Sequence, residues 1–167
     1  MIMKIGFGYD IHPLRKGKSL ILGGVKIDYD KGLEGHSDAD VVIHALMDAL
    51  LGAAGEGDIG IHFPDNEPKW KGISSLILLD QIRQLIESKY KINNIDITII
   101  LEKPKLSPYY PYMKKNIARV LKLDEDNINI KASTNEGIGI IGKGEGIASF
   151  CVALLEERGK DSPISGK

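Results

Sequence analysis

The segment from Ile147 to Leu155 is apolar at almost every position, and it constrains the fold more than any other part of the sequence. Successive side chains of a β-strand point to opposite faces of the sheet, so this strand presents apolar side chains on both faces. The helices of the chain can cover one face, and three helices on a small mixed sheet are expected to lie on the same side. A neighbouring subunit is the natural cover for the second face. The alternative is a central strand in a core that the chain itself covers on both faces.

The rest of the chain alternates between predicted strands and helices, with no internal repeat and no linker that would divide it. Apolar residues at helical spacing predict three helices, which begin at Ser37, at about Ser74 (ending near Tyr90) and at Pro108. Apolar runs and alternating patterns predict strands over residues 3–9 (ended by Pro13), 19–22, 25–27, 95–101, 128–132 and 147–155. This order favours an α+β fold, a two-layer sandwich of a mixed β-sheet with helices on one face.

The chain of 167 residues is long enough for one domain with a substantial core, which we expect over residues 1–159, followed by a flexible tail at 160–167. Its 22 basic and 23 acidic residues give a net charge of −1, which argues against a general electrostatic affinity for nucleic acid or an anionic membrane. No apolar segment approaches the ~18 residues of a membrane span, and the N-terminus lacks the features of a signal peptide. The sequence therefore predicts a cytoplasmic protein.

The only cysteine, Cys151, lies within the apolar segment at 147–155 and has no partner for an internal disulfide. A cysteine in such surroundings is more often a small core residue than a reactive nucleophile. We therefore expect Cys151 to belong to the core.

Asp10 and His12 stand two positions apart at the end of the first predicted strand. Side chains with this spacing in a strand point to the same face, so the two should project together. With His44 from the following helix they would form a set of one carboxylate and two imidazoles. Such a set leaves the fourth position of a tetrahedral Zn²⁺ open for a substrate oxygen. The alternative is an aspartate that caps a turn beside a half-buried histidine.

A polar stripe runs along the helix that is predicted to begin at Ser37, a good N-cap residue followed by acidic residues that suit the helix dipole. Asp40, His44 and Asp48 recur at i, i+4 and i+8, so they share one face of this helix. In the functional interpretation, His44 binds a metal and Asp48, one turn away, orients it. In the alternative interpretation, the stripe is a solvated surface.

Three loops combine glycine or proline with polar residues that suit phosphate and metal ions. Residues 102–106 offer two lysines to an anion, while residues 133–137 and 142–146 offer hydroxyls and accessible backbone amides. The carboxylate of Glu136 could hold a hard divalent ion such as Mg²⁺ against phosphate oxygens. Each loop on its own could equally be a surface turn, and His62 is expected to be a partly buried loop residue rather than a ligand.

Six motifs occur together in the chain, namely GFGYDIH, GHSDADVVIHALMDALLGA, GDIGIHFPD, EKPKL, IKASTNEGIG and GKGEGIA. In this order and spacing they resemble the 2-C-methyl-D-erythritol 2,4-cyclodiphosphate synthase family of the non-mevalonate isoprenoid pathway. The resemblance extends from Lys4 to about Glu157. It implies a single synthase domain over residues 1–159 that assembles as a homotrimer, with sites between adjacent subunits.

The resemblance also implies two metal ions and a role for each motif. Zn²⁺, one per subunit, would be bound by Asp10, His12 and His44, and a second divalent cation, Mg²⁺ or Mn²⁺, by Glu136. Catalytic roles would fall to His36, Ser37 and Thr134 and, from its place one helical turn from His44, to Asp48. Substrate-binding residues would be Asp58, Gly60 and Asp65 at the methylerythritol end, Leu101, Lys103, Pro104, Lys105 and Leu106 around the cytosine, and Ser133, Asn135, Ile140 and Lys143.

A few positions depart from the family pattern. Family members commonly carry an aromatic residue and an arginine where this chain has Ile140 and Lys143. Lysine lacks the bidentate fork that arginine offers a phosphate. The departure therefore weakens the expectation of isoprenoid-phosphate binding in the central cavity of the trimer, but it does not affect the zinc site. Asn135, where threonine is usual, keeps the capacity to form hydrogen bonds.

The implied reaction closes the substrate 4-diphosphocytidyl-2-C-methyl-D-erythritol 2-phosphate on itself. Its 2-phosphate attacks the β-phosphorus, CMP leaves, and 2-C-methyl-D-erythritol 2,4-cyclodiphosphate is the product. The reaction needs no protein nucleophile, so catalysis must come from bending the substrate into attack geometry and neutralising charge. Two other classes of protein remain open. A zinc-dependent phosphoesterase would give a linear product, and a non-catalytic nucleotide-sensing module would bind CMP without turnover.

Overall fold

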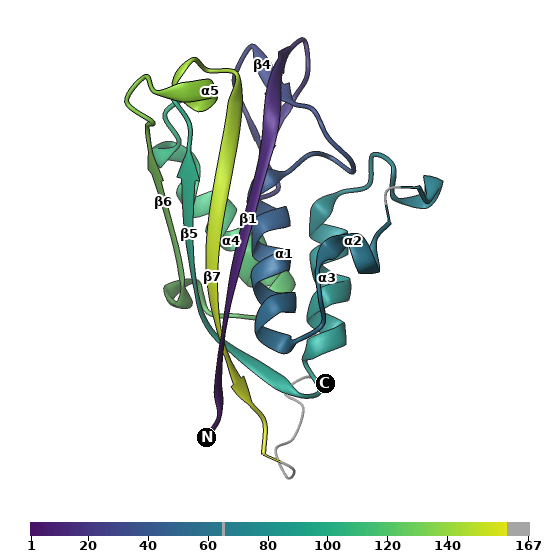
Figure 1. Cartoon of the computed structure of the whole chain (residues 1–167). Helices are drawn as coiled ribbons and strands as arrows, with labels where there is room; N and C mark the ends of the chain where they lie inside the picture. The colour runs from purple at the N-terminus through teal and green to yellow at the C-terminus, as the bar shows by residue number, and fades with distance from the viewer. Residues whose placement is uncertain (65, 160–167) are drawn as a thin grey trace.

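A five-stranded mixed sheet forms one layer of the chain in the computed structural model (Figure 1). The structure describes residues 1–64 and 66–159, so Asp65 and the predicted tail at 160–167 lie outside the described residues. Neighbouring strands are antiparallel except β5 and β6, which run parallel. The strand order is β4 (Lys31–Leu33), β1 (Met3–Lys16), β7 (Gly146–Glu157), β5 (Tyr90–Ile100) and β6 (Ile128–Ser133), and the hairpin of β2 (Leu20–Leu22) and β3 (Val25–Ile27) is separate.

The long helices lie together behind the sheet, which confirms the predicted α+β class and the mixed sheet (Figure 1). These helices are α1 (Val41–Ala54), α3 (Ser75–Ile86) and α4 (Tyr110–Leu121). Short helical segments in the connections are α2 (Ile59–His62), α5 (Gly139–Gly142), η1 (Pro68–Trp70), η2 (Ser107–Tyr109) and η3 (Glu125–Asn127). Among the described residues, no helix is long and apolar enough to cross a membrane.

Helix α1 packs directly on β1 because β1 carries glycine where the two elements meet. A Cβ atom on Gly6 would lie 1.8 Å from a backbone oxygen of α1, and one on Gly8 would lie 1.9 Å from another. Both separations are far below van der Waals contact, so only glycine permits this approach. Every second residue of β1 points toward α1, and therefore Asp10 and His12 follow the glycines on the same face.

Helix α1 begins at Val41, so the predicted start at Ser37 is wrong. Ser37 and Ala39 have φ values of 54° and 55°, which are incompatible with a right-handed helix. Asp40 is the N-cap instead, and its buried carboxylate accepts N–H groups from the first turn of α1 and from the turn of the β2–β3 hairpin. Burial and the charge of Asp38 raise the pKa of Asp40 to about 6. Asp40 therefore joins the hairpin to the helix and takes no part in a polar surface stripe.

Two strands extend beyond their predicted limits. Pro13 does not end β1, which continues to Lys16. Proline has no N–H to donate, but Pro13 lies where β1 leaves β7 and turns to β4, and its carbonyl accepts the N–H of Glu34. Strand β5 begins at Tyr90 because it pairs with the far end of β7. The preceding helix α3 therefore stops at Ile86, before the predicted end near Tyr90.

The face of the sheet away from the helices is not covered by the described residues (Figure 1). The exposed side chains on this face are apolar along β1 and β7. Ile5 is 73% exposed, Phe7 62% and Val152 42%. The ring of Phe150 lies 5.0 Å from that of Tyr9, between centroids. We call these five residues the open face. Because the helices cover only the other side, the alternative of a core covered on both faces by one chain is excluded for the described residues, and the homotrimer stays a prediction.

Candidate functional site

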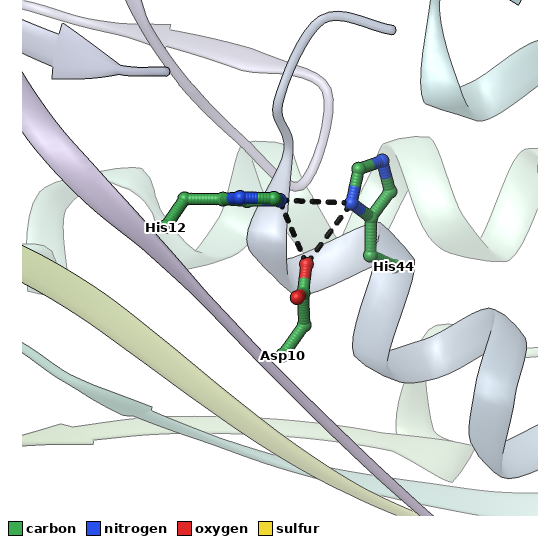
Figure 2. Close-up of side chains that lie close together, drawn as sticks. All are labelled: Asp10, His12 and His44. Atoms are coloured by element: carbon green, nitrogen blue, oxygen red, sulfur yellow. Dashed lines mark hydrogen bonds and ion pairs between the residues drawn. The ribbon is translucent and has the colours of Figure 1, made fainter. Parts of the chain in front are cut away.

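Asp10, His12 and His44 meet at one point between β1 and α1 (Figure 2). The Oδ2 atom of Asp10 lies 2.9 Å from Nε2 of His12 and 3.0 Å from Nδ1 of His44. The two ring nitrogens lie 3.1 Å apart. Asp10 and His12 project from the same face of β1, as their spacing predicts, and His44 comes from the first turn of α1. The structure thus brings together the three residues that the sequence predicts to bind zinc.

Two members of this triad, Asp10 and His44, have shifted pKa values. Burial raises the pKa of Asp10, but the hydrogen bonds from His12 and His44 outweigh burial and lower the pKa well below its ordinary value. Burial lowers the pKa of His44, but the hydrogen bond and the charge of Asp10 outweigh burial, so the pKa is raised. The triad therefore combines an ionised carboxylate, which attracts a cation, with an imidazole from which a metal ion must displace a proton.

The spacing of the three atoms fits a tetrahedral metal ion. Ligands about 2.0–2.1 Å from Zn²⁺ at tetrahedral angles lie about 3.3–3.4 Å from one another. The observed separations of 2.9, 3.0 and 3.1 Å are slightly shorter, so a small outward movement of the side chains would accommodate the ion. One carboxylate and two imidazoles also leave a fourth position for a substrate atom, as in catalytic zinc sites. The residues present therefore fit Zn²⁺.

The second ring nitrogen of His44 meets two serine hydroxyls. Nε2 lies 2.9 Å from Oγ of Ser37 and 3.1 Å from Oγ of Ser75. The Ser75 hydroxyl donates to the carboxylate of Asp38, which also accepts the backbone N–H of Ser75 at 2.9 Å. Sequence reasoning missed Ser75 and Asp38 as site residues. Its only signals were the place of Ser75 near a predicted helix start and the presence of Asp38 in the GHSDAD motif.

A cavity of about 340 Å³ opens beside the triad. Its walls include the predicted site residues His36, Ser37 and Gly60, and the aromatic side chains of Phe63 and Trp70. The two aromatic rings meet edge to face, with centroids 5.1 Å apart. A cavity lined by both polar groups and apolar side chains fits a ligand that has a charged and an apolar part.

Two predicted carboxylates close to this cavity bind backbone amides. Asp58 is the N-cap of α2, where it accepts the N–H of Ile61 at 3.1 Å. Asp48 accepts the N–H of Ile59 at 2.9 Å, and burial raises its pKa. The Asp48 carboxylate thus connects α1 to the first residue of α2 by a hydrogen bond. The sequence predicts instead that Asp48 orients His44. The catalytic role of Asp48 stays a prediction.

A second cavity, of about 670 Å³, lies where β5 and β6 end. Parallel strands bring their carboxyl ends to the same edge of the sheet, so the loops that follow β5 and β6 lie together. The lining combines predicted residues from both loops, namely Leu101, Lys103, Pro104, Lys105, Leu106, Ser133 and Thr134. Glu102, to which the sequence analysis gave no role, accepts the N–H of Asn135 at 2.7 Å. This hydrogen bond connects the loop after β5 to the loop after β6.

Glu136, the predicted ligand of a second metal ion, lies on the exposed loop after β6. Its φ is 52°, and its Oε1 accepts a hydrogen bond from the Thr134 hydroxyl at 2.8 Å. Ile140 in α5 is 62% exposed, and Lys143 directly after α5 is exposed as well. The single chain therefore presents these four side chains to solvent.

The triad and the second cavity lie on different strands of the sheet. The triad lies between β1 and α1, whereas the second cavity lies at the ends of β5 and β6, and β7 runs between β1 and β5. Neighbouring strands are about 4.8 Å apart, so β5 and β6 lie two and three such spacings from β1, about 10 and 14 Å. A single chain therefore keeps the triad apart from the second cavity.

Two further residues behave as the sequence predicts. Cys151 is buried in the core, and burial raises the pKa of its thiol, which disfavours the reactive thiolate. Nε2 of His62 donates to the carbonyl oxygen of Glu56 at 2.8 Å. His62 is thus half-buried and outside the triad, although it is the last residue of the short helix α2 rather than a loop residue.

Known proteins resemble the chain along nearly its whole length. Residues 3–156 match the model of the YgbB family. A protein of Clostridium perfringens named 2-C-methyl-D-erythritol 2,4-cyclodiphosphate synthase is 57% identical over 154 residues, which are 92% of this chain and 99% of the relative. A protein of the same name from Clostridium acetobutylicum is 58% identical over 154 residues, with the same coverage of both chains.

Solved structures show the same fold. A CDP complex of IspF from Plasmodium falciparum has a TM-score of 0.83 and 40% identity, and it covers 94% of this chain and 97% of its own. The bifunctional IspDF from Campylobacter jejuni has a TM-score of 0.90 and 41% identity, and it covers 94% of this chain. This chain spans only 43% of that bifunctional protein and thus corresponds to one part of it.

Proposed function

The chain belongs to the YgbB family, the family of the 2-C-methyl-D-erythritol 2,4-cyclodiphosphate synthases, and is an enzyme of cyclodiphosphate formation; from this premise we propose its substrate and its site. The proposed substrate is 4-diphosphocytidyl-2-C-methyl-D-erythritol 2-phosphate. The proposed products are 2-C-methyl-D-erythritol 2,4-cyclodiphosphate and CMP.

The observation that carries this proposal is the combination of a triad fit for Zn²⁺ with a separate cavity of nucleotide size. The triad of Asp10, His12 and His44 lies beside a cavity that has polar and apolar walls. The second cavity is lined by both loops that the sequence assigns to cytosine and diphosphate binding. Two of the solved relatives are described as CDP-bound, which supports a cytidine nucleotide as part of the substrate of this chain.

In the proposed reaction one phosphate–oxygen bond replaces another within the substrate. An oxygen of the 2-phosphate attacks the β-phosphorus. The bond between the β-phosphorus and the oxygen that it shares with the α-phosphorus breaks, and CMP leaves with that oxygen. Since no protein nucleophile takes part, the enzyme must hold both ends of the substrate so that the attacking oxygen lies in line with the bond that breaks.

The charged groups of the site suit this task. Zn²⁺ bound by Asp10, His12 and His44, and a second divalent cation, Mg²⁺ or Mn²⁺, bound by Glu136, would supply Lewis-acid stabilisation of phosphate charge. His36 and Ser37 would orient the phosphates from the wall of the first cavity, and the Thr134 hydroxyl would do so beside Glu136. The apolar wall of Phe63 and Trp70 would exclude water, which favours intramolecular attack over hydrolysis.

We also propose that the complete site forms between subunits of a homotrimer. Within one chain about 10–14 Å of sheet separates β1, which carries two residues of the triad, from the strands that end at the second cavity, which favours a site completed by another copy of the chain. The open face is apolar and uncovered in the described residues of the single chain, which favours its burial against further copies. Such an assembly would bring the second cavity of one chain to the triad of the next.

Phosphorus NMR of the purified protein with the proposed substrate tests this function. The proposal predicts that CMP and the cyclic diphosphate appear together, and that removing the metal with a chelator stops both. A linear diphosphate would instead indicate a zinc-dependent phosphoesterase. Tight binding of CMP without any turnover would indicate a nucleotide-sensing module. Either result would overturn the proposed cyclisation.

A further inference from the structure

We infer that Ser75, together with Asp38, is a positioning residue for His44: the pair keeps a proton on Nε2 of the imidazole, so that Nδ1 is the atom that binds metal. The inference rests on the proposed function for the metal that His44 would bind. It gives a role to two residues outside the set of metal ligands.

The hydroxyl of Ser75 lies between an imidazole and a carboxylate. Ser75 is fully buried at the start of α3, and its Oγ is 3.1 Å from Nε2 of His44. On its other side Oγ is hydrogen-bonded to Oδ1 of Asp38. The second oxygen of Asp38 accepts the backbone N–H of Ser75 at 2.9 Å. Ser74 is the N-cap residue of α3, but its side chain accepts no hydrogen bond from the helix. The carboxylate of Asp38, which precedes α1, instead accepts a free N–H group at the start of α3.

The direction of each hydrogen bond follows from the number of protons. A serine hydroxyl carries one proton, and an ionised carboxylate can only accept, so Ser75 donates its proton to Asp38. The oxygen of Ser75 is then an acceptor toward His44, and Nε2 must be the donor. A proton held on Nε2 leaves the lone pair of Nδ1 for a cation, and Nδ1 is the atom that faces Asp10 and His12.

Ser37 is the competing acceptor for the same proton. Its Oγ lies 2.9 Å from Nε2 of His44 and 3.1 Å from Oγ of Ser75. Ser37, however, is only half-buried and lines the cavity in which substrate is expected. Ser75 is buried, and its hydroxyl proton is donated to Asp38. We therefore assign Ser75 as the residue that accepts the Nε2 proton of His44, and we expect the hydroxyl of Ser37 to contact the substrate.

The affinity of the purified full chain for Zn²⁺, measured by competition with a chelator and without substrate, tests this inference. Losing the partner that orients a metal-bound histidine typically weakens metal binding by about 10- to 100-fold, and we expect a loss of this size in S75A and in D38A. Ser149 provides a matched control. It is equally buried, lies opposite Asp10 across β1 and β7, and its hydroxyl has no hydrogen-bond partner among the described residues. S149A should bind Zn²⁺ like the unaltered protein.

Two results would overturn the assignment. One is a folded S75A protein with unchanged affinity for Zn²⁺, and the other is a loss of affinity in S37A but not in S75A. The thermal unfolding of each metal-free variant shows whether a loss of affinity reflects misfolding. Because the measurement needs no substrate, its outcome is separate from the test of cyclisation, which uses the unaltered protein.

Proton and nitrogen NMR of the unaltered, zinc-loaded protein gives a second test that needs no variant. If the buried hydroxyl of Ser75 accepts from His44, the Nε2–H proton should be observed and should exchange slowly with water. Rapid exchange of that proton would contradict the inference, because it would mean that Nε2 faces solvent or a mobile acceptor.

Discussion

The Nε2 atom of His12 lies 3.1 Å from the Nδ1 atom of His44, although the two residues are 32 positions apart in the sequence. At this distance the two nitrogens can share a cation, share a proton, or both donate to the carboxylate of Asp10. Asp10 contributes a carboxylate oxygen within 3.0 Å of both. The three ligand atoms are therefore close enough to hold one metal ion together.

Alanine in place of Asp10, His12 or His44 should remove most of the bound zinc and most of the activity, because each residue supplies one of three ligands. Elemental analysis of the purified variants measures the zinc. Full zinc occupancy in two of the three variants would refute the assignment of the triad.

Gly8→Ala should disturb the site without touching a ligand. The added Cβ would lie 1.9 Å from a backbone oxygen of α1, so the helix that carries His44 must move away from β1. We expect a loss of about 1–3 kcal/mol in the free energy of unfolding of the metal-free protein, measured in denaturant, together with weaker zinc binding.

Gly52→Ala is the control for this variant. Gly52 lies in the same helix with nothing within 4 Å of an added Cβ, so alanine should leave zinc binding unchanged and stabilise α1 by about 0.5–1 kcal/mol. The close approach of α1 to β1 would not be needed for the site if the Gly8 variant bound zinc as tightly as the Gly52 variant.

The sequence predicts those parts of the site that depend on local spacing. Asp10 and His12 share a face because side chains alternate along a strand. His44 completes the predicted set of zinc ligands because it lies on the helix that is predicted to follow. Ser75 could not be found in this way. Its contact with His44 joins residues 31 positions apart and depends on how α3 packs against α1.

The wrongly predicted ends of helices and strands also result from contacts between residues that are far apart in the sequence. Serine is a common N-cap residue, so Ser37 is a reasonable prediction for the start of α1. Asp40 is the N-cap instead, because its carboxylate also accepts the backbone N–H groups of the β2–β3 hairpin. Pro13 would end an isolated strand. Here β1 changes partner at this residue, and the carbonyl oxygen of Pro13 still accepts the N–H of Glu34.

Glu136→Gln should leave zinc bound and sharply change the dependence of turnover on Mg²⁺ or Mn²⁺. Glutamine keeps the shape of the side chain and can still accept the hydrogen bond from Thr134, but it loses the charge that holds a hard cation. Titration of activity with Mg²⁺ measures the effect. An unchanged Mg²⁺ dependence would mean that Glu136 has another role.

An aspartate at Phe7 or Val152 should prevent assembly. Both side chains belong to the open face, and burying an unpaired charge there would cost several kcal/mol. Light scattering should give the mass of a trimer for the unaltered protein and a smaller mass for these variants. Ile77→Asp, an exposed position on α3, should assemble normally. A fully active monomer of the unaltered protein would contradict the proposed assembly.

Mixing two inactive variants tests most directly whether the triad of one chain and the second cavity of another form one cyclising site. His44→Ala removes a metal ligand, and Ser133→Trp fills the second cavity from an exposed position. Neither variant alone should release CMP or cyclic diphosphate, whereas every mixed trimer contains one site with an intact triad and an intact cavity. We therefore predict that the mixture regains part of the activity and forms the cyclic product. No product from verified mixed trimers would show that each chain must carry a complete site of its own.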